Sequence, residues 1–458
     1  MKLFTQSALA RSSGVCLFAF AVVSAGCTSP ARLTSEQAPP EQAAQWTGTW
    51  GTAPAGPTAP GSIQSFANQT LRLIVHTSIG GSQVRIRVSN EHGAVPLYIG
   101  AARIALQRTG AEIVPGSDRA LTFSGSRSVT IPAGSPAVSD PIAFDVPASS
   151  DLAISLYFPA QVQVTTIHEN AFQTNYVSAP GNFAAASVLP TQKAITSWPF
   201  LTQVDVLSRA PVLVAFGDSI TEGAITTLDA NQRWPDLLAR RVQSAARAAS
   251  AAGKALVHPT PAIGIVNRGI GGNRLLRDSG GDGLAGRAAL ARFDRDVLAT
   301  AGVEHVIVLL GINDIGVPGT PGSTLEQAVT VDDLVAGYRQ LIARARARGL
   351  KIYGGTMTPF EGTIYPDYYS PEKERVRQAA NAWIRTSGEF DGVIDFDRAV
   401  RDPDHPARLL PAFDGGDHLH PGDLGMRAMA DAVPLELFAA KRTGSGGVDA
   451  VPTLIGTR

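Results

Sequence analysis

Two segments of the sequence carry side chains that could support nucleophilic catalysis. Ser219 lies in GDSIT, directly after an apolar stretch, where a fold can display a nucleophile, although a serine at such a place is also a common helix N-cap. Asp417 and His420 lie three residues apart in DGGDHLHP, so the carboxylate could orient the imidazole and stabilise its charged form. A serine hydroxyl needs such a base to accept its proton. His418 and Asp414 are local rivals for these two roles.

Two further segments could donate hydrogen bonds to a developing negative charge. Glycines in NRGIGGN, residues 267–273, allow the backbone to approach a ligand closely and point N–H groups at it, or they only form a tight turn. Asn313, in GIND, could donate from its side-chain amide. Losing one such donor typically costs an enzyme about 2.7–4 kcal/mol of barrier. The other His residues show no metal-ligand spacing such as HExxH, so no metal or other cofactor is expected.

The apolar pattern after residue 208 predicts the elements that position these segments. Continuous apolar stretches, typical of buried strands, alternate with amphipathic stretches, typical of helices. This alternation indicates a mostly parallel sheet covered by helices on both faces, and ligands bind such sheets beyond the carboxyl ends of the strands. The predicted strands cover residues 212–216, 263–266, 306–310, 352–354 and 393–396.

Residues 46–208 show a different period. Short segments of alternating apolar and polar residues are separated by turn-forming clusters, which favours an all-β sandwich or jelly roll. The aromatic side chains of this region could stack on sugar rings, but we favour packing in the core or between domains. The clearest strand segments are residues 71–75, 84–88, 152–157 and 203–206.

Three segments are candidates for substrate binding. The polar segments 168–170 and 173–176 could bring His168 and Tyr176 to the catalytic cleft, although an ordinary surface loop is the favoured interpretation. Residues 360–369 are rich in aromatic side chains, so Phe360 and Tyr365 could form a wall of the cleft or pack at the surface.

The first 27 residues have the features of an export signal. A charged start precedes an apolar run that is too short for a membrane span of about 20 residues, and small residues follow it. Cys27 directly after Ala-Gly resembles the lipidated Cys of bacterial lipoproteins, and ordinary signal cleavage is the alternative. We therefore expect a periplasmic or outer-membrane-anchored lipoprotein, or a secreted protein, whose only membrane contact is a lipid at Cys27. The expected parts are a signal (1–27), a linker (28–45), a β-domain (46–208), a catalytic domain (209–441) and a flexible tail (442–458).

Composition excludes several classes of protein. Lys and Arg together number 39, as do Asp and Glu, so the formal net charge is zero and nucleic acid is not an expected partner. The two Cys residues, Cys16 and Cys27, both lie in the predicted signal, which leaves no disulfide framework in the rest of the chain. With 44% hydrophobic residues, the 458-residue chain can build sizeable cores.

In this order, GDSIT, NRGIGGN, GIND and DHLHP strongly resemble the four sequence blocks of the SGNH, or GDSL, hydrolase family. The resemblance implies a flavodoxin-like three-layer domain with a mostly parallel five-stranded sheet. It also implies that Ser219 is the nucleophile, His420 its general base and Asp417 the residue that orients His420. The oxyanion hole would consist of the backbone N–H groups of Ser219 and Gly272 and the side chain of Asn313.

A finer resemblance extends into the N-terminal half. WTGTW, VRIRVSNEHG, RWPDLLARR and TMTPFEG are similar to segments of an exported bacterial subgroup in which a β-domain precedes the hydrolase. Members of that subgroup are usually grouped with xylan-type carbohydrate esterases. This implies a serine esterase that hydrolyses short-chain acyl esters, above all acetyl esters, of a small-molecule or polysaccharide substrate. A broad carboxylesterase or lipase acting on lipid or aryl esters is one alternative, and a non-catalytic glycan-binding lipoprotein is another.

Overall fold

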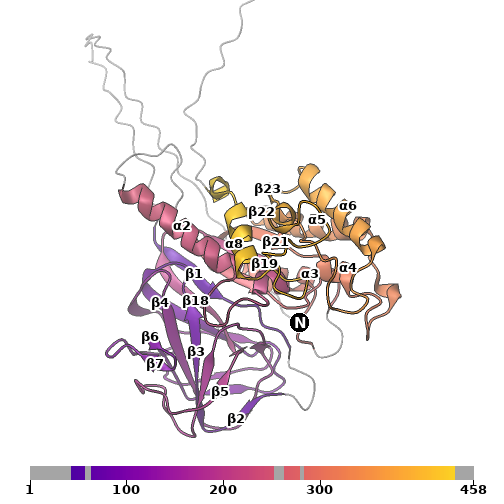
Figure 1. The fold of residues 1–458 in the computed structure, drawn as a ribbon. Coiled ribbons are helices and arrows are strands. Elements are labelled where there is room, and N and C mark those ends of the chain that lie inside the picture. Colours follow the sequence, from indigo (N-terminus) through magenta and orange to yellow (C-terminus); the bar gives the residue numbers. More distant parts are fainter. Residues whose placement is uncertain (1–42, 57–62, 252–261, 279–282, 439–458) are drawn as a thin grey trace, which may run out of the picture. The chain divides into compact units, whose positions relative to one another are not determined.

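The computed structural model describes residues 43–56, 63–251, 262–278 and 283–438 (Figure 1). The expected signal with Cys27 and the expected tail, residues 442–458, lie outside these ranges. Within them, antiparallel sheets come first along the chain, and strands alternating with helices follow. No helix in the described ranges is both long and apolar enough to cross a bilayer.

Two antiparallel sheets with a shared apolar core form the N-terminal region, which confirms the predicted mostly-β character of this part. In β4 (Gly81–Ser89) Val84, Ile86 and Val88 are buried while the residues between them are partly exposed, as expected of a strand with one face in a core. One sheet has the order β1 (Gln45–Gly51), β18 (Leu201–Ser208), β4 and β10 (Pro136–Val138), with β11 (Ile142–Val146) also paired to β4. The other has the order β16 (Thr191–Ile195), β15 (Asn175–Ser178), β3 (Gln69–His76), β12 (Asp151–Phe158), β6 (Ala101–Thr109) and β7 (Glu112–Ile113), with β8 (Arg119–Leu121) paired to β6.

Three short strand pairs complete this region, which we call the sandwich. They are β2 (Ser65–Phe66) with β13 (Val162–Gln163), β5 (Leu97–Ile99) with β9 (Val129–Ile131), and β14 (Ile167–His168) with β17 (Trp198–Pro199).

The second region contains a five-stranded parallel sheet, which confirms the predicted sheet. When its strands are numbered along the chain, they lie in the spatial order 2-1-3-4-5, which occurs in flavodoxin-like doubly wound folds. Adjacent strands run parallel throughout. In spatial order the strands are β20 (Gly264–Gly269), β19 (Val212–Gly217), β21 (Val303–Leu309), β22 (Lys351–Gly355) and β23 (Gly392–Ile394).

The helices of the second region pack in two groups, one that joins α2 with α7 and α8, and one that joins α3 and α4 with α5 and α6. The long helices α5 and α6 begin at side-chain caps, Thr330 and Ser370. The bounds are α1 (Ser219–Glu222), α2 (Trp234–Ala251), α3 (Ala289–Phe293), α4 (Ile312–Gly316), α5 (Val331–Ala347), α6 (Pro371–Thr386), α7 (Phe396–Val400) and α8 (Asp423–Ala432). A π-helical turn (Asp294–Leu298) follows α3, and two 3₁₀ turns cover Leu325–Gln327 and Leu435–Phe438.

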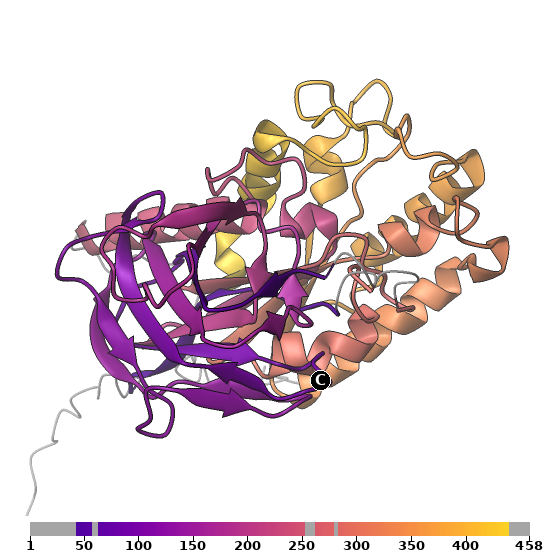
Figure 2. The ribbon, with the colours of Figure 1, turned by 90° about the horizontal axis from the view of Figure 1, so that it is seen from below.

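The sandwich and the parallel-sheet region lie side by side (Figure 2). Strand β1 packs against β20. Glycine makes this approach possible, because a Cβ atom on Gly264 would lie only 2.5 Å from the carbonyl oxygen of Gly48. The backbone N–H of Gly48 also donates to the carbonyl oxygen of Ala301 across the same contact (3.0 Å).

Candidate active site

Ser219 is the first residue of α1, immediately beyond the carboxyl end of β19. The N-cap of this short helix is Asp218, whose side chain accepts the backbone N–H of Ile220 (3.0 Å), so the serine hydroxyl is not used for capping. The preceding turn needs a glycine, because a Cβ atom on Gly217 would lie 2.1 Å from the hydroxyl oxygen of Thr221. The local sequence thus displays Ser219 Oγ at the edge of the sheet.

A continuous series of hydrogen bonds joins Ser219, His420 and Asp417. His420 Nε2 lies 2.7 Å from Ser219 Oγ, and His420 Nδ1 lies 2.6 Å from Asp417 Oδ2. Asp417 Oδ1 also accepts the backbone N–H groups of Leu419 (3.0 Å) and His420 (2.8 Å). Burial raises the pKa of Asp417, but the bonds and the charge of His420 outweigh it and lower this pKa to about 2. Asp417 is therefore ionised at neutral pH.

The rival residues Asp414 and His418 form a separate pair. His418 Nδ1 bonds Asp414 Oδ2, and Asp414 Oδ1 accepts the backbone N–H groups of Gly416 (2.8 Å) and His418 (3.1 Å). Half of the His418 side chain is exposed, whereas that of His420 is buried. The geometry therefore favours His420 and Asp417 as the partners of Ser219, and Asp414 braces the loop that carries them.

Gly272 and Asn313 lie beyond the carboxyl ends of β20 and β21 and line the same pocket as Ser219 and His420. Gly272 has a φ of 71°, which glycine adopts without strain. The amide of Asn313 donates from Nδ2 to the carbonyl oxygen of Asn273 (3.0 Å), and its Oδ1 accepts the hydroxyl of Tyr368 (2.8 Å). With its oxygen and one N–H occupied, Asn313 has a single N–H left for a ligand.

Asp314 connects two of these loops. Its carboxylate accepts the backbone N–H groups of Leu275 (2.6 Å) and Leu276 (2.9 Å). These bonds connect the start of α4 to the chain that follows the glycine turn of residues 267–273. Burial raises the pKa of Asp314 to about 6 although these bonds oppose the rise, and burial also raises the pKa of Asp218 to about 7.

A pocket of about 400 Å³ opens over these groups. Tyr365 forms part of its wall, and its hydroxyl lies 3.3 Å from Asp417 Oδ2. Among the described residues, no group of three or more His, Cys, Asp or Glu side chains is arranged to hold a metal ion. The lining residues are Asn170, Phe172, Ser219, Glu222, Ala224, Ile225, Gly271, Gly272, Asn313, Tyr365, Tyr368, Leu419 and His420.

The other three expected substrate-binding residues do not line this pocket. Phe360 is completely buried and packs against Tyr368 and Tyr369, because it belongs to the hydrophobic core of the second region. Tyr176 lies in β15 and packs against the small cluster around Ile74. His168 is buried behind the pocket, where its ring lies beside Glu222.

The segment around His168 nevertheless reaches the site, contrary to the favoured interpretation as an ordinary surface loop. Asn170 and Phe172, which follow β14, line the pocket together with residues of the second region. Sequence reasoning also missed Tyr368 and Glu222. The polar stretch after His168 was the only sequence signal for Asn170 and Phe172, and no periodicity marks Tyr368.

Comparison with known proteins finds a family for the second region. Residues 215–428 match the model of the GDSL-like Lipase/Acylhydrolase family. This part of the chain belongs to that family. Ser219, Gly272, Asn313, Asp417 and His420 all lie within the match. The chain is accordingly a carboxylic ester hydrolase, and the non-catalytic alternative is set aside.

Solved structures of GDSL-type and other esterases are similar to about half of the chain. A GDSL-like lipase from Bacteroides thetaiotaomicron is 17% identical, with a TM-score of 0.32 over 48% of this chain and 84% of that one. An aryl esterase from M. smegmatis is 15% identical, with a TM-score of 0.35 over 49% of this chain and 96% of that one. A catalytic mutant of an acetylxylan esterase from Geobacillus stearothermophilus is 22% identical, with a TM-score of 0.34 over 48% and 91%. No curated protein matches the chain.

Proposed function

We propose that this chain is an exported serine esterase that removes short acyl groups, above all acetyl groups, from carbohydrate esters. The observation that carries the proposal is the hydrogen-bonded series of Ser219, His420 and Asp417 at a pocket that Gly272 and Asn313 also line. The resemblance of the sequence to exported xylan-type esterases supports the carbohydrate part.

In the proposed acylation step, Ser219 Oγ attacks the ester carbonyl carbon while His420 Nε2 accepts the hydroxyl proton. The carbonyl π electrons move to oxygen, and the oxyanion accepts hydrogen bonds from the N–H groups of Ser219 and Gly272 and from the Asn313 amide. Collapse of this intermediate breaks the bond to the alcohol oxygen, which takes the proton from His420. Asp417 stays ionised and stabilises the imidazolium.

Deacylation repeats these steps with water as the nucleophile. His420 accepts a proton from the water as its oxygen attacks the acyl carbon on Ser219. The second tetrahedral intermediate collapses with loss of Ser219 Oγ, which recovers a proton from His420, and the carboxylic acid leaves.

Turnover of p-nitrophenyl acetate tests the proposed nucleophile. Ser219→Ala should abolish enzymatic turnover, whereas Ser126→Ala, at an exposed serine of the sandwich, should leave it unchanged. Retention of wild-type kcat by Ser219→Ala would refute the mechanism.

An acyl-chain series tests the short-chain part of the proposal. We expect kcat/KM on p-nitrophenyl esters to fall steeply beyond about four acyl carbons, because one methylene too many in a confined pocket is typically worth about 1–3 kcal/mol. Equal rates on acetate and octanoate would argue for a lipase instead.

A second candidate, an esterase for aryl or lipid esters, is favoured by apolar side chains at the pocket. Ile225 and Tyr365 line it although 42% and 43% of their surfaces are exposed, and Ile364 beside Tyr365 is 63% exposed. Exposed apolar groups of this kind suit an apolar alcohol moiety. Comparing naphthyl acetate with acetylated xylo-oligosaccharides separates the candidates, since a higher kcat/KM on the sugar ester supports the carbohydrate proposal and the reverse result supports this one.

The export part of the proposal rests on the sequence around Cys27. Replacing Cys27 with Ser should move the protein from the membrane fraction to the soluble fraction if this cysteine carries a lipid. An unchanged distribution would favour a plainly cleaved, secreted form.

A further inference from the structure

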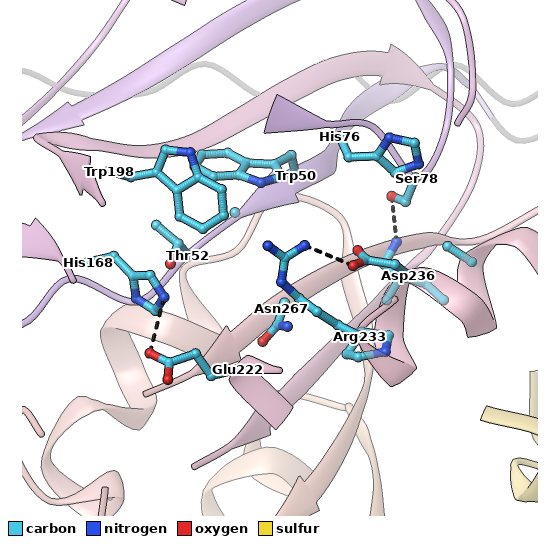
Figure 3. A pocket seen from close by; sticks show the side chains of 14 residues that line it. Trp50, Thr52, His76, Ser78, His168, Trp198, Glu222, Arg233, Asp236 and Asn267 are labelled. Carbon is cyan, nitrogen blue, oxygen red and sulfur yellow. Dashed lines mark hydrogen bonds and ion pairs between the residues drawn. The ribbon is translucent and has the colours of Figure 1, made fainter. Parts of the chain in front are cut away.

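Glu222 lies between two cavities. It is the last residue of α1, three positions after the nucleophile Ser219, and it is buried. On one side it lines the catalytic pocket. On the other it faces a small cavity between the sandwich and the parallel-sheet region, opposite His168 and Trp198 (Figure 3). No step of the proposed reaction uses this carboxyl group.

The contacts of Glu222 join the glycine turn to the sandwich. The carboxyl group accepts hydrogen bonds from the backbone N–H of Gly271 and the side chain of Asn170. Its Oε1 lies 3.3 Å from His168 Nε2. The packing is tight, since a Cβ atom on Gly271 would lie 2.9 Å from Glu222 Oε2 and 3.2 Å from Asn170 Nδ2.

We propose that Glu222 is a positioning residue of the oxyanion hole, which holds the Gly271–Gly272 turn in register with Ser219, and that His168 and Asn170 of the sandwich fix it in place. Because Glu222 occupies the N–H of Gly271, the N–H of Gly272 is the one that remains for the substrate. The sandwich thereby takes part in catalysis without touching the reacting atoms. This inference rests on the proposed serine mechanism.

The carboxyl group acts in its neutral form. Burial raises the pKa of Glu222 to about 8 and lowers the pKa of His168 to about 4. Among the charged groups that act on Glu222, Arg233 favours its ionisation and Asp218 opposes it. His168 Nδ1 donates to the carbonyl oxygen of Ala53 (3.0 Å), and His168 also bonds the backbone of Asn170, so a fixed and uncharged imidazole lies beside the carboxyl group.

A neutral group at this position also matters for the chemistry. The oxyanion develops at the pocket that Glu222 lines, and a carboxylate there would repel it in a site of low dielectric constant. Ionisation of Glu222 should therefore slow acylation as the pH rises through about 8.

Two substitutions separate positioning from bulk packing. Glu222→Gln keeps an acceptor for Gly271 and Asn170 and carries no charge, so it should retain wild-type kcat on p-nitrophenyl acetate at neutral pH and lose the decline above about pH 8. Glu222→Ala removes both bonds and should lower kcat about 10²-fold with little change in KM, as expected when reacting groups are misplaced. Asp236→Asn, at a carboxylate that lines the same cavity but bonds Arg233 (2.9 Å), is the matched control.

Amide hydrogen exchange of the segment 264–276 provides a readout that does not depend on activity. Exchange at the glycine turn should speed up in Glu222→Ala and remain slow in Glu222→Gln and Asp236→Asn. Equal exchange and equal kcat in Glu222→Ala and the wild type would overturn the inference, as would a Glu222→Gln enzyme as slow as Glu222→Ala at neutral pH. Failure of the serine mechanism itself would show separately, as turnover that survives Ser219→Ala.

Discussion

At the scale of single residues, the orientation of Asn313 shows what the sequence can and cannot predict. The order of polar residues after buried strands, together with the resemblance to the SGNH family, singled out Asn313, Ser219 and His420 as candidates, because each lies close in sequence to the strand or loop that displays it. Tyr368 lies 55 residues from Asn313 and has no periodic relation to it. Its hydroxyl nevertheless accounts for the direction in which the Asn313 amide points.

The variant Tyr368→Phe tests this role. It removes the 2.8 Å bond to Asn313 Oδ1 but keeps the buried ring, against which Gly316 packs closely. We expect kcat on p-nitrophenyl acetate to fall at least about tenfold with KM nearly unchanged, because a donor to the oxyanion acts mainly in the transition state. Tyr369→Phe is the control, since Tyr369 packs on the same Phe360 ring. A change confined to KM would contradict the positioning role.

At the scale of elements, the predicted strands agree with the structure because their apolar runs are buried on both faces. The boundaries differ where side chains end an element. The last predicted strand, 393–396, stops at Ile394 because Asp395 caps α7 by accepting the backbone N–H of Arg398 (3.1 Å). The hydrogen bonds that hold the carboxyl ends of β19 and β20 together could not be predicted from the sequence. They come from a single arginine in α3, which no sequence pattern marks.

That arginine, Arg292, is completely buried. Its guanidinium donates to the carbonyl oxygens of Gly217 and Arg268 (both 2.8 Å), to Asn273 Oδ1 (3.0 Å, from Nε) and to Asp296 Oδ2 (2.9 Å). It therefore fixes the carboxyl ends of β19 and β20, which precede Ser219 and the glycine turn.

Arg292→Ala should lower the free energy of unfolding by about 3 kcal/mol or more, because it leaves a buried carboxylate short of a partner. Urea denaturation measures this change. Arg375→Ala, in an exposed pair with Glu372, should leave the midpoint almost unchanged. Similar midpoints for the two variants would show that Arg292 does not hold the strand ends.

At the scale of the whole described region, the period of the apolar pattern indicated two kinds of domain but not their contact. The contact joins residues far apart in the sequence, which leave no local pattern. Arg268, buried at the end of β20, donates to the carbonyl oxygens of Thr52 and Thr202 in the sandwich. Ser78 accepts the backbone N–H of Ile265 (2.8 Å). These bonds hold the sandwich against the parallel-sheet region. The segment that follows β14 is held at the catalytic pocket by Arg233, which donates to the carbonyl oxygen of Ala171.

Close packing of β1 on β20 makes Gly264 sensitive to substitution. Gly264→Ala should destabilise the protein by about 1–3 kcal/mol, the usual range for overpacking, because the backbone of Gly48 must move. Gly56→Ala, where the added methyl group meets only ordinary contacts, is the matched control. Thermal unfolding at matched conditions distinguishes the two, and equal melting temperatures would mean that the contact is looser than described.

The central claim is that Ser219 is the nucleophile of an ester hydrolase, and covalent labelling tests it most directly. The protein would be treated with an active-site serine phosphonate and the site of modification located by mass spectrometry of its peptides. The account predicts a single adduct on Ser219 that is absent from Ser219→Ala. An adduct on another residue, or labelling that persists in Ser219→Ala, would contradict it.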